Sequence, residues 1–298
     1  MRRKIARFLK SPMAAAIVYF GVVWFVVFLG ADNYRAEFHK TLQNPDLAIW
    51  CMLVAAQVTV WMFVIGPAYR RALDYSNQVR ERGLELLCDL AALLLLSGVL
   101  VISRYRDIPA IVLKFQNAKL TMVTLLGVVT ILPCLLGLRL VSFEAEAMVP
   151  DGESTYSLDR FAKLRSDLRW FVGVAGGIVG GAALARGALN NAMLAIDSAH
   201  PPPISGFILY AGFCTGVVAV FYVPAHVVFA RAARAIITQV TERTAETAEA
   251  WIEMMGNRAK LEEGLGLTAT PTALLGELGP LVAPVIGGVL SFLIRINR

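Results

Sequence analysis

Long uncharged stretches divide this 298-residue chain into blocks, and charged connectors separate one block from the next. The stretches cover residues 13–30, 47–69, 90–103, 120–138, 170–185 and 205–230. A helix needs about 20 apolar residues to cross roughly 30 Å of hydrocarbon, since each residue advances it by about 1.5 Å. The pattern therefore predicts an all-α fold, a polytopic helical bundle integral to a membrane.

The composition excludes an ordinary soluble domain. Residues of the set AVILMFWYC make up 57% of the chain, and only 17% of its residues are charged. Soluble domains contain about 45–50% apolar residues on a set that adds Gly and omits Tyr. With its 24 glycines added and its 8 tyrosines removed, this chain reaches about 62% on that set.

The blocks predict three regions along the chain. Residues 1–230 form the bundle, with six expected spans at about 13–30, 47–69, 84–103, 120–140, 170–189 and 205–230. Residues 231–271 are expected to form a cytoplasmic helix and linker. A C-terminal apolar segment, 272–298, is long enough to cross but contains Glu277, Pro280 and Pro284. Because proline removes a helix hydrogen bond, this segment either spans, re-enters or packs against the bundle.

The distribution of Lys and Arg predicts the orientation, because positive charge is retained on the cytoplasmic side. With a cytoplasmic amino terminus, the inner segments 1–12, 69–83, 139–169 and 231–271 contain 19 basic residues. The outer connectors 31–46, 104–119 and 186–204 contain 7. We therefore expect an integral plasma membrane protein, of the bacterial inner-membrane type, with its amino terminus in the cytoplasm. Anionic headgroups account for the net charge of +6 without nucleic acid.

Two amphipathic stretches lie on the predicted cytoplasmic side. In residues 157–170, apolar side chains recur at helical spacing, which predicts a helix that lies in the headgroup layer or braces the inner ends of the bundle. Residues 231–256 carry an apolar stripe that includes Trp251 and Met255, a candidate surface for a soluble partner. A second stripe is acidic and either faces solvent or lines the vestibule of an oligomeric pore; it comprises Glu242, Glu246, Glu249 and Glu253.

The fifth block contains the strongest packing pattern. Small residues at intervals of four let two helix backbones approach closely, and here two such registers overlap: Gly173, Gly177 and Gly181, and Gly176 and Gly180. We expect these glycines to pack against a neighbouring span or against the same span of another subunit.

Few polar residues lie inside the blocks. Gln57, near the middle of the second span, either bonds a neighbouring helix or lines a pore. Glu85 and Asp89 lie one turn apart near several arginines, so interfacial ion pairs are expected. Arg186 is expected to reach the outer headgroups, with Asp197 as a partner.

Signatures of catalysis are missing from the sequence. It contains no H-E-x-x-H, G-x-S-x-G or P-loop pattern and no C-x-x-C spacing, so neither an enzyme nor a metal or other cofactor is predicted. Three of the four cysteines lie inside apolar blocks and the fourth lies at the edge of one, where thiols act as small apolar groups.

Three functional classes remain, and the sequence narrowly favours the first. The first class is an oligomeric channel or pore-forming membrane effector, a homo-oligomer with the acidic stripe near its axis. The second is a non-conducting membrane anchor or receptor that binds a soluble cytoplasmic protein. The third, a small-solute transporter, is disfavoured because transport sites usually gather several polar groups near the midplane, where this chain has only Gln57.

The charge asymmetry makes a direct prediction of topology. A reporter fused at residue 10, 76 or 155 should read as cytoplasmic, and one at 38, 111 or 200 as external. Paired alkaline phosphatase and fluorescent protein fusions measure this. A cytoplasmic result at 111 would show that the third and fourth spans are wrongly paired.

Overall fold

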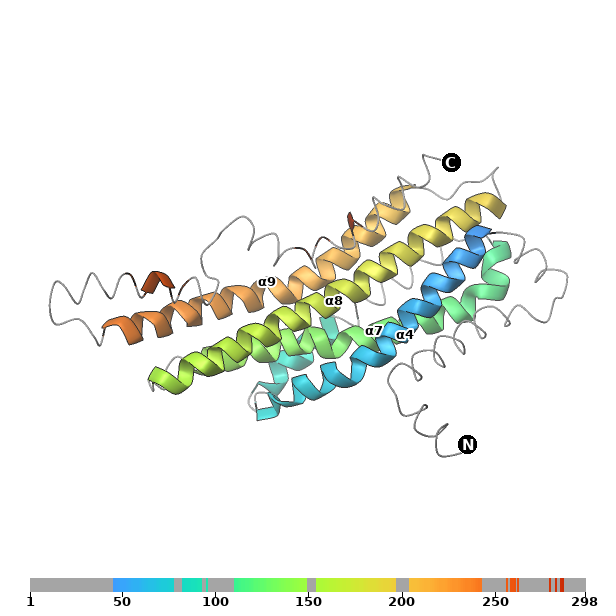
Figure 1. Ribbon diagram of the computed structural model, residues 1–298. Coiled ribbons are helices and arrows are strands. Elements are labelled where there is room, and N and C mark those ends of the chain that lie inside the picture. Colours follow the sequence, from blue (N-terminus) through green and yellow to red (C-terminus); the bar gives the residue numbers. More distant parts are fainter. Residues whose placement is uncertain are drawn as a thin grey trace, which may run out of the picture.

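The computed structural model describes residues 45–77, 82–92, 95, 110–148, 154–196 and 204–242, with 256, 258–260, 262, 279, 282 and 285–286. Within these residues the chain is all α (Figure 1). The four long helices are α4 (Pro45–Leu73), α7 (Ala110–Ala147), α8 (Ser154–Ile196) and α9 (Ile204–Glu242). A further short helical stretch covers residues 83–92.

All four long helices contain segments that are long and apolar enough to cross a membrane. These segments are Ala48–Leu73, Val123–Ala147, Asp159–Leu194 and Ile208–Gln239. They match the second, fourth, fifth and sixth predicted spans, which supports a multi-pass membrane protein. The first predicted span and nearly all of the last apolar segment lie outside the described residues, and only part of the third is described. The counts of six and seven spans therefore stay predictions.

Local sequence explains where α4 begins and ends. Proline at the first position loses no helix bond, and Asp46 in the first turn favours the helix dipole. Arg70 and Arg71 complement the dipole at the last turn.

In the interior, prolines occur in three of the helices, at Pro67, Pro133 and Pro224. Membrane helices tolerate them because neighbouring groups satisfy the freed carbonyls.

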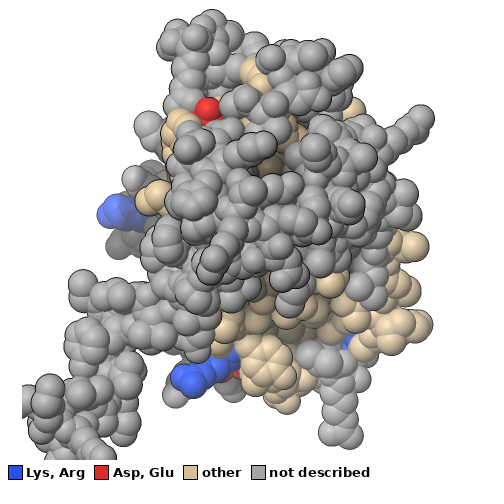
Figure 2. All heavy atoms as spheres, turned by 90° about the vertical axis from the view of Figure 1, so that its right-hand side faces the viewer, with Lys and Arg blue, Asp and Glu red and all other residues tan. Residues whose placement is uncertain are grey.

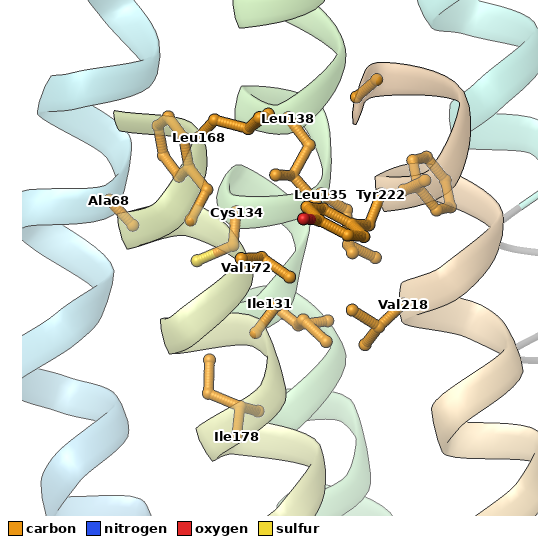
Figure 3. Close-up of a cluster of buried hydrophobic side chains, with 14 of the residues drawn as sticks. Ala68, Ile131, Cys134, Leu135, Leu138, Leu168, Val172, Ile178, Val218 and Tyr222 are labelled. Carbon is orange, nitrogen blue, oxygen red and sulfur yellow. The ribbon is translucent and has the colours of Figure 1, made fainter. Parts of the chain in front are cut away.

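Helix α8 runs antiparallel to α4, α7 and α9 (Figure 1). Helices α7 and α8 pack against each other, and each also contacts both α4 and α9. In Figure 3, α4 and α9 accordingly lie on opposite sides of the central α7–α8 pair. The bundle thus has two inner helices and two flanking ones.

Two predictions about helix boundaries need correction. Residues 157–170 are not a separate helix on the membrane surface, because α8 continues without a break from Ser154 to Ile196. Their apolar stripe instead faces the bundle, where Phe161, Leu164 and Leu168 are buried. Likewise α9 continues from the sixth predicted span to Glu242, so residues 231–242 of the helix predicted after that span are continuous with it.

Apolar side chains from all four helices fill the space between them (Figure 3). The largest fully buried side chains include Leu135 and Leu138 of α7, Phe161 and Phe171 of α8 and Val218 of α9. Lipid tails are as apolar as these side chains, so inside a membrane the core is stabilised by close packing rather than by escape from water.

The closest helix approaches involve glycines of α7. A Cβ atom on Gly137 would lie 2.5 Å from Cε1 of Phe171, and one on Gly127 would lie 2.9 Å from Cη2 of Trp61. Aromatic rings of α8 and α4 therefore lie directly on the α7 backbone. Both glycines belong to the fourth predicted span, which the sequence analysis did not single out for packing.

These approaches predict opposite effects for one substitution at two sites. Gly137→Ala should lower the free energy of unfolding by about 1–3 kcal/mol, because the ring of Phe171 is fully buried and has no room to move. Gly173→Ala, where a Cβ meets nothing within 4 Å, should be neutral or stabilising by up to about 1 kcal/mol. Thermal unfolding of the purified proteins in detergent measures both, and equal stability would contradict the described α7–α8 contact.

Candidate functional site: the charged end of the bundle

The uncharged stretches of the four helices end toward the same end of the bundle. The first charged residues beyond them are Arg70 on α4, Arg139 on α7, Arg169 on α8 and Arg231 on α9. Contacts between helices place the first three at a similar level: Arg71 reaches Asp167, and Gly137 lies against Phe171. Arg231 lies further along, because Phe229 packs against Phe161 of α8. We call this end of the bundle the charged end; it comprises residues 70–77, 82–92, 139–148, 154–169 and 231–242.

The charged end projects well beyond the level of Arg169. About 16 residues of α8 lie past it, which corresponds to roughly 24 Å of helix. Its interior remains apolar: Val141, Phe161 and Ile237 have no exposed surface. The rings of Phe161 and Phe229 lie 4.5 Å apart and join α8 to α9. The same bundle thus continues outside the expected hydrocarbon, now with a charged exterior.

Asp167 is the most completely buried carboxylate that bonds across helices at this end. Its side chain is only 8% exposed, and each of its oxygens accepts a hydrogen bond from α4 or the turn that follows it. Arg71 Nη1 donates to Oδ1 at 3.0 Å, and the Tyr75 hydroxyl donates to Oδ2 at 2.5 Å. Because a buried carboxylate without hydrogen-bond donors is very costly, these two donors stabilise Asp167 inside the bundle.

Arg71 and Tyr75 are themselves fixed by this environment. The Arg71 guanidinium lies 4.4 Å from the centre of the Trp170 ring, a cation–π contact with the same helix that carries Asp167. Burial raises the pKa of Tyr75 far above its ordinary value of 10.0, and the hydrogen bond and negative charge of Asp167 add to that shift. Tyr75 is therefore a neutral donor at physiological pH.

A second group of ion pairs joins residues 82–92 to α7. Arg139 Nε donates to Asp89 Oδ2 at 2.8 Å, and Arg82 Nη2 lies 3.0 Å from Glu146 Oε2. The ring of Phe143 has both guanidiniums close to it, with Arg82 at 4.8 Å and Arg139 at 5.0 Å from its centre. The start of the third predicted span is thus tied to the end of the fourth.

Two further pairs complete the charged end. Arg160 pairs with Glu144, a buried carboxylate of α7, and so joins α8 to α7. Lys163 Nζ lies 3.5 Å from Asp74 Oδ2, with both side chains more than half exposed, so this pair contributes little to stability. The pairs therefore differ in burial: the carboxylate of Asp167 is buried, whereas both side chains of the Lys163–Asp74 pair are exposed.

Gln57 joins two helices. Its Nε2 donates to the Ile178 carbonyl of α8 at 3.4 Å, and its side-chain amide carbon lies 3.6 Å from where a Cβ on Gly181 would be. This is the interhelical hydrogen bond expected as one of the two uses of Gln57. Its other use, in lining a pore, stays a prediction.

The remaining glycines of the predicted packing pattern face in different directions. Gly176 is buried and Gly180 half-buried, whereas Gly173 and Gly177 are exposed and a Cβ on either would meet nothing within 4 Å. No described helix of this chain approaches closely at Gly173 or Gly177. The part of the prediction that assigns this face to another subunit stays open.

Other predicted site residues are only partly described. Glu85 pairs with Arg82 at 3.6 Å, while Asp89 pairs with Arg139, an arginine 50 positions away that the sequence analysis did not consider. Arg186 is half-buried on α8, whereas Asp197 lies outside the described residues. Glu242 ends α9. The other predicted residues of this region lie outside the described residues: Glu246, Glu249, Trp251, Glu253 and Met255.

Sequence reasoning missed the residues that organise this end: Asp167, Tyr75 and Arg139. One signal was present, because Asp167 is an acidic residue on the α8 turn that also carries buried Leu164 and Leu168. A charge on an apolar helix face requires a partner. The identity of that partner was not readable, because it lies on a helix more than 90 residues away.

The opposite end of the bundle differs in character. Figure 2 shows that end, and the described surface visible there is mostly uncharged, with a few charged side chains at its edges. Among the residues with described positions, no group of three metal-binding side chains occurs at either end.

Comparison with protein-family models, curated proteins and solved structures finds no match to this chain. Function must therefore be argued from the contacts above.

The Asp167 cluster predicts a clear difference between two Asp→Asn substitutions. Asp167→Asn removes the charge that pairs with Arg71 and weakens the acceptor for Tyr75, so the free energy of unfolding should fall by about 1–3 kcal/mol. Asp74→Asn, at an exposed pair, should cost about 0–1 kcal/mol. Chemical denaturation in detergent micelles gives both values. If Asp74→Asn cost as much as Asp167→Asn, the central role of Asp167 would be wrong.

Proposed function

We propose that this protein is a non-conducting membrane scaffold, an anchor or receptor whose charged end docks a soluble partner on the cytoplasmic side. The observation that carries this proposal is the continuation of α7, α8 and α9 past Arg139, Arg169 and Arg231, respectively, with a buried apolar core. A bundle that only crossed a membrane would need no such extension.

The packing inside the expected hydrocarbon supports a scaffold over an ion path through the described helices. Leu135, Phe171 and Val218 belong to one cluster of buried apolar side chains and have no exposed surface. Ion pathways need rings of polar or charged groups, and within this region Gln57 is used to join α4 to α8.

The ion pairs support a rigid platform. Asp167 joins α8 to α4, Glu144 joins α7 to α8, and Asp89 joins residues 82–92 to α7. A partner that binds a rigid surface loses less entropy than one that must first order it. The apolar stripe with Trp251 and Met255, further along the chain from α9, is the proposed place of docking.

An oligomeric channel is the second candidate, and the exposed face of α8 favours it. Gly173 and Gly177 leave open space where the α8 of another copy can approach closely. A pore in that case lies between subunits, with Glu242, Glu246, Glu249 and Glu253 at its mouth.

Ion flux from liposomes separates the two functions. For a scaffold we expect the purified protein to release no more K⁺ or Cl⁻ than empty liposomes across a range of voltage, salt and pH. For a channel we expect cation-selective flux that falls when all four glutamates are replaced by Gln, most strongly at low salt, where screening over about 8 Å is relieved. Gln keeps nearly the helix propensity of Glu, so the fold is retained.

The mass of the protein in detergent provides the matched control. Flux from a protein that is monomeric at the same concentration would contradict a pore between subunits. Reproducible flux that the four substitutions abolish would overturn the scaffold proposal.

A further inference from the structure

We draw no further inference here: the strongest candidate, the exposed face of α9 on which Val220, Val223 and Val227 lead into Arg231 and Arg234, is an apolar helix face, and nothing in the described part of the structure shows what covers it.

Discussion

The carboxylate of Asp167 sets the register of the charged end. It lies almost fully buried on α8, and both of its oxygens are bonded by residues at the end of α4 and in the turn after it. A shift of α4 by one turn would leave a charge unpaired in an apolar surrounding, and the cost of an unpaired buried charge is large. The relative height of the two helices is therefore fixed by one residue, and the apolar contacts above it follow from that height.

Within the expected hydrocarbon, the physical basis of packing is different. Since apolar side chains gain nothing by leaving lipid for protein, the helices need close contacts and a few polar ones. The rings of Phe171 and Trp61 against Gly137 and Gly127 supply the first kind of contact. The bond from Gln57 to the Ile178 carbonyl supplies the second. Together they hold α4 and α8 against α7.

Both regions bear on function. The core filled with apolar side chains and the ion pairs that join the helices at the charged end support the proposed scaffold. The open surface of α8 at Gly173 and Gly177 is where the second candidate, an oligomeric channel, would place another copy of α8.

The sequence by itself determined which segments are helical and apolar enough to cross a membrane. It also located where the uncharged stretch of each described helix ends, because hydrophobicity and charge are properties of each residue and are read locally. The stripe of Phe161, Leu164 and Leu168 was readable for the same reason, and packing against the inner ends of the bundle was one of its two predicted places, although its continuity with the fifth span in one helix was not predicted.

Only the tertiary structure decided which residues meet. The pairs Asp167 with Tyr75, Asp89 with Arg139 and Gly137 with Phe171 depend on how far each helix is rotated and shifted against its neighbour. Neither quantity is encoded in the periodicity of one helix. For that reason the glycine pattern of α8 was visible in the sequence, whereas the closest approaches, at glycines of α7, were not. An isolated glycine permits a close contact only where an aromatic ring of another helix lies at the same level along the bundle.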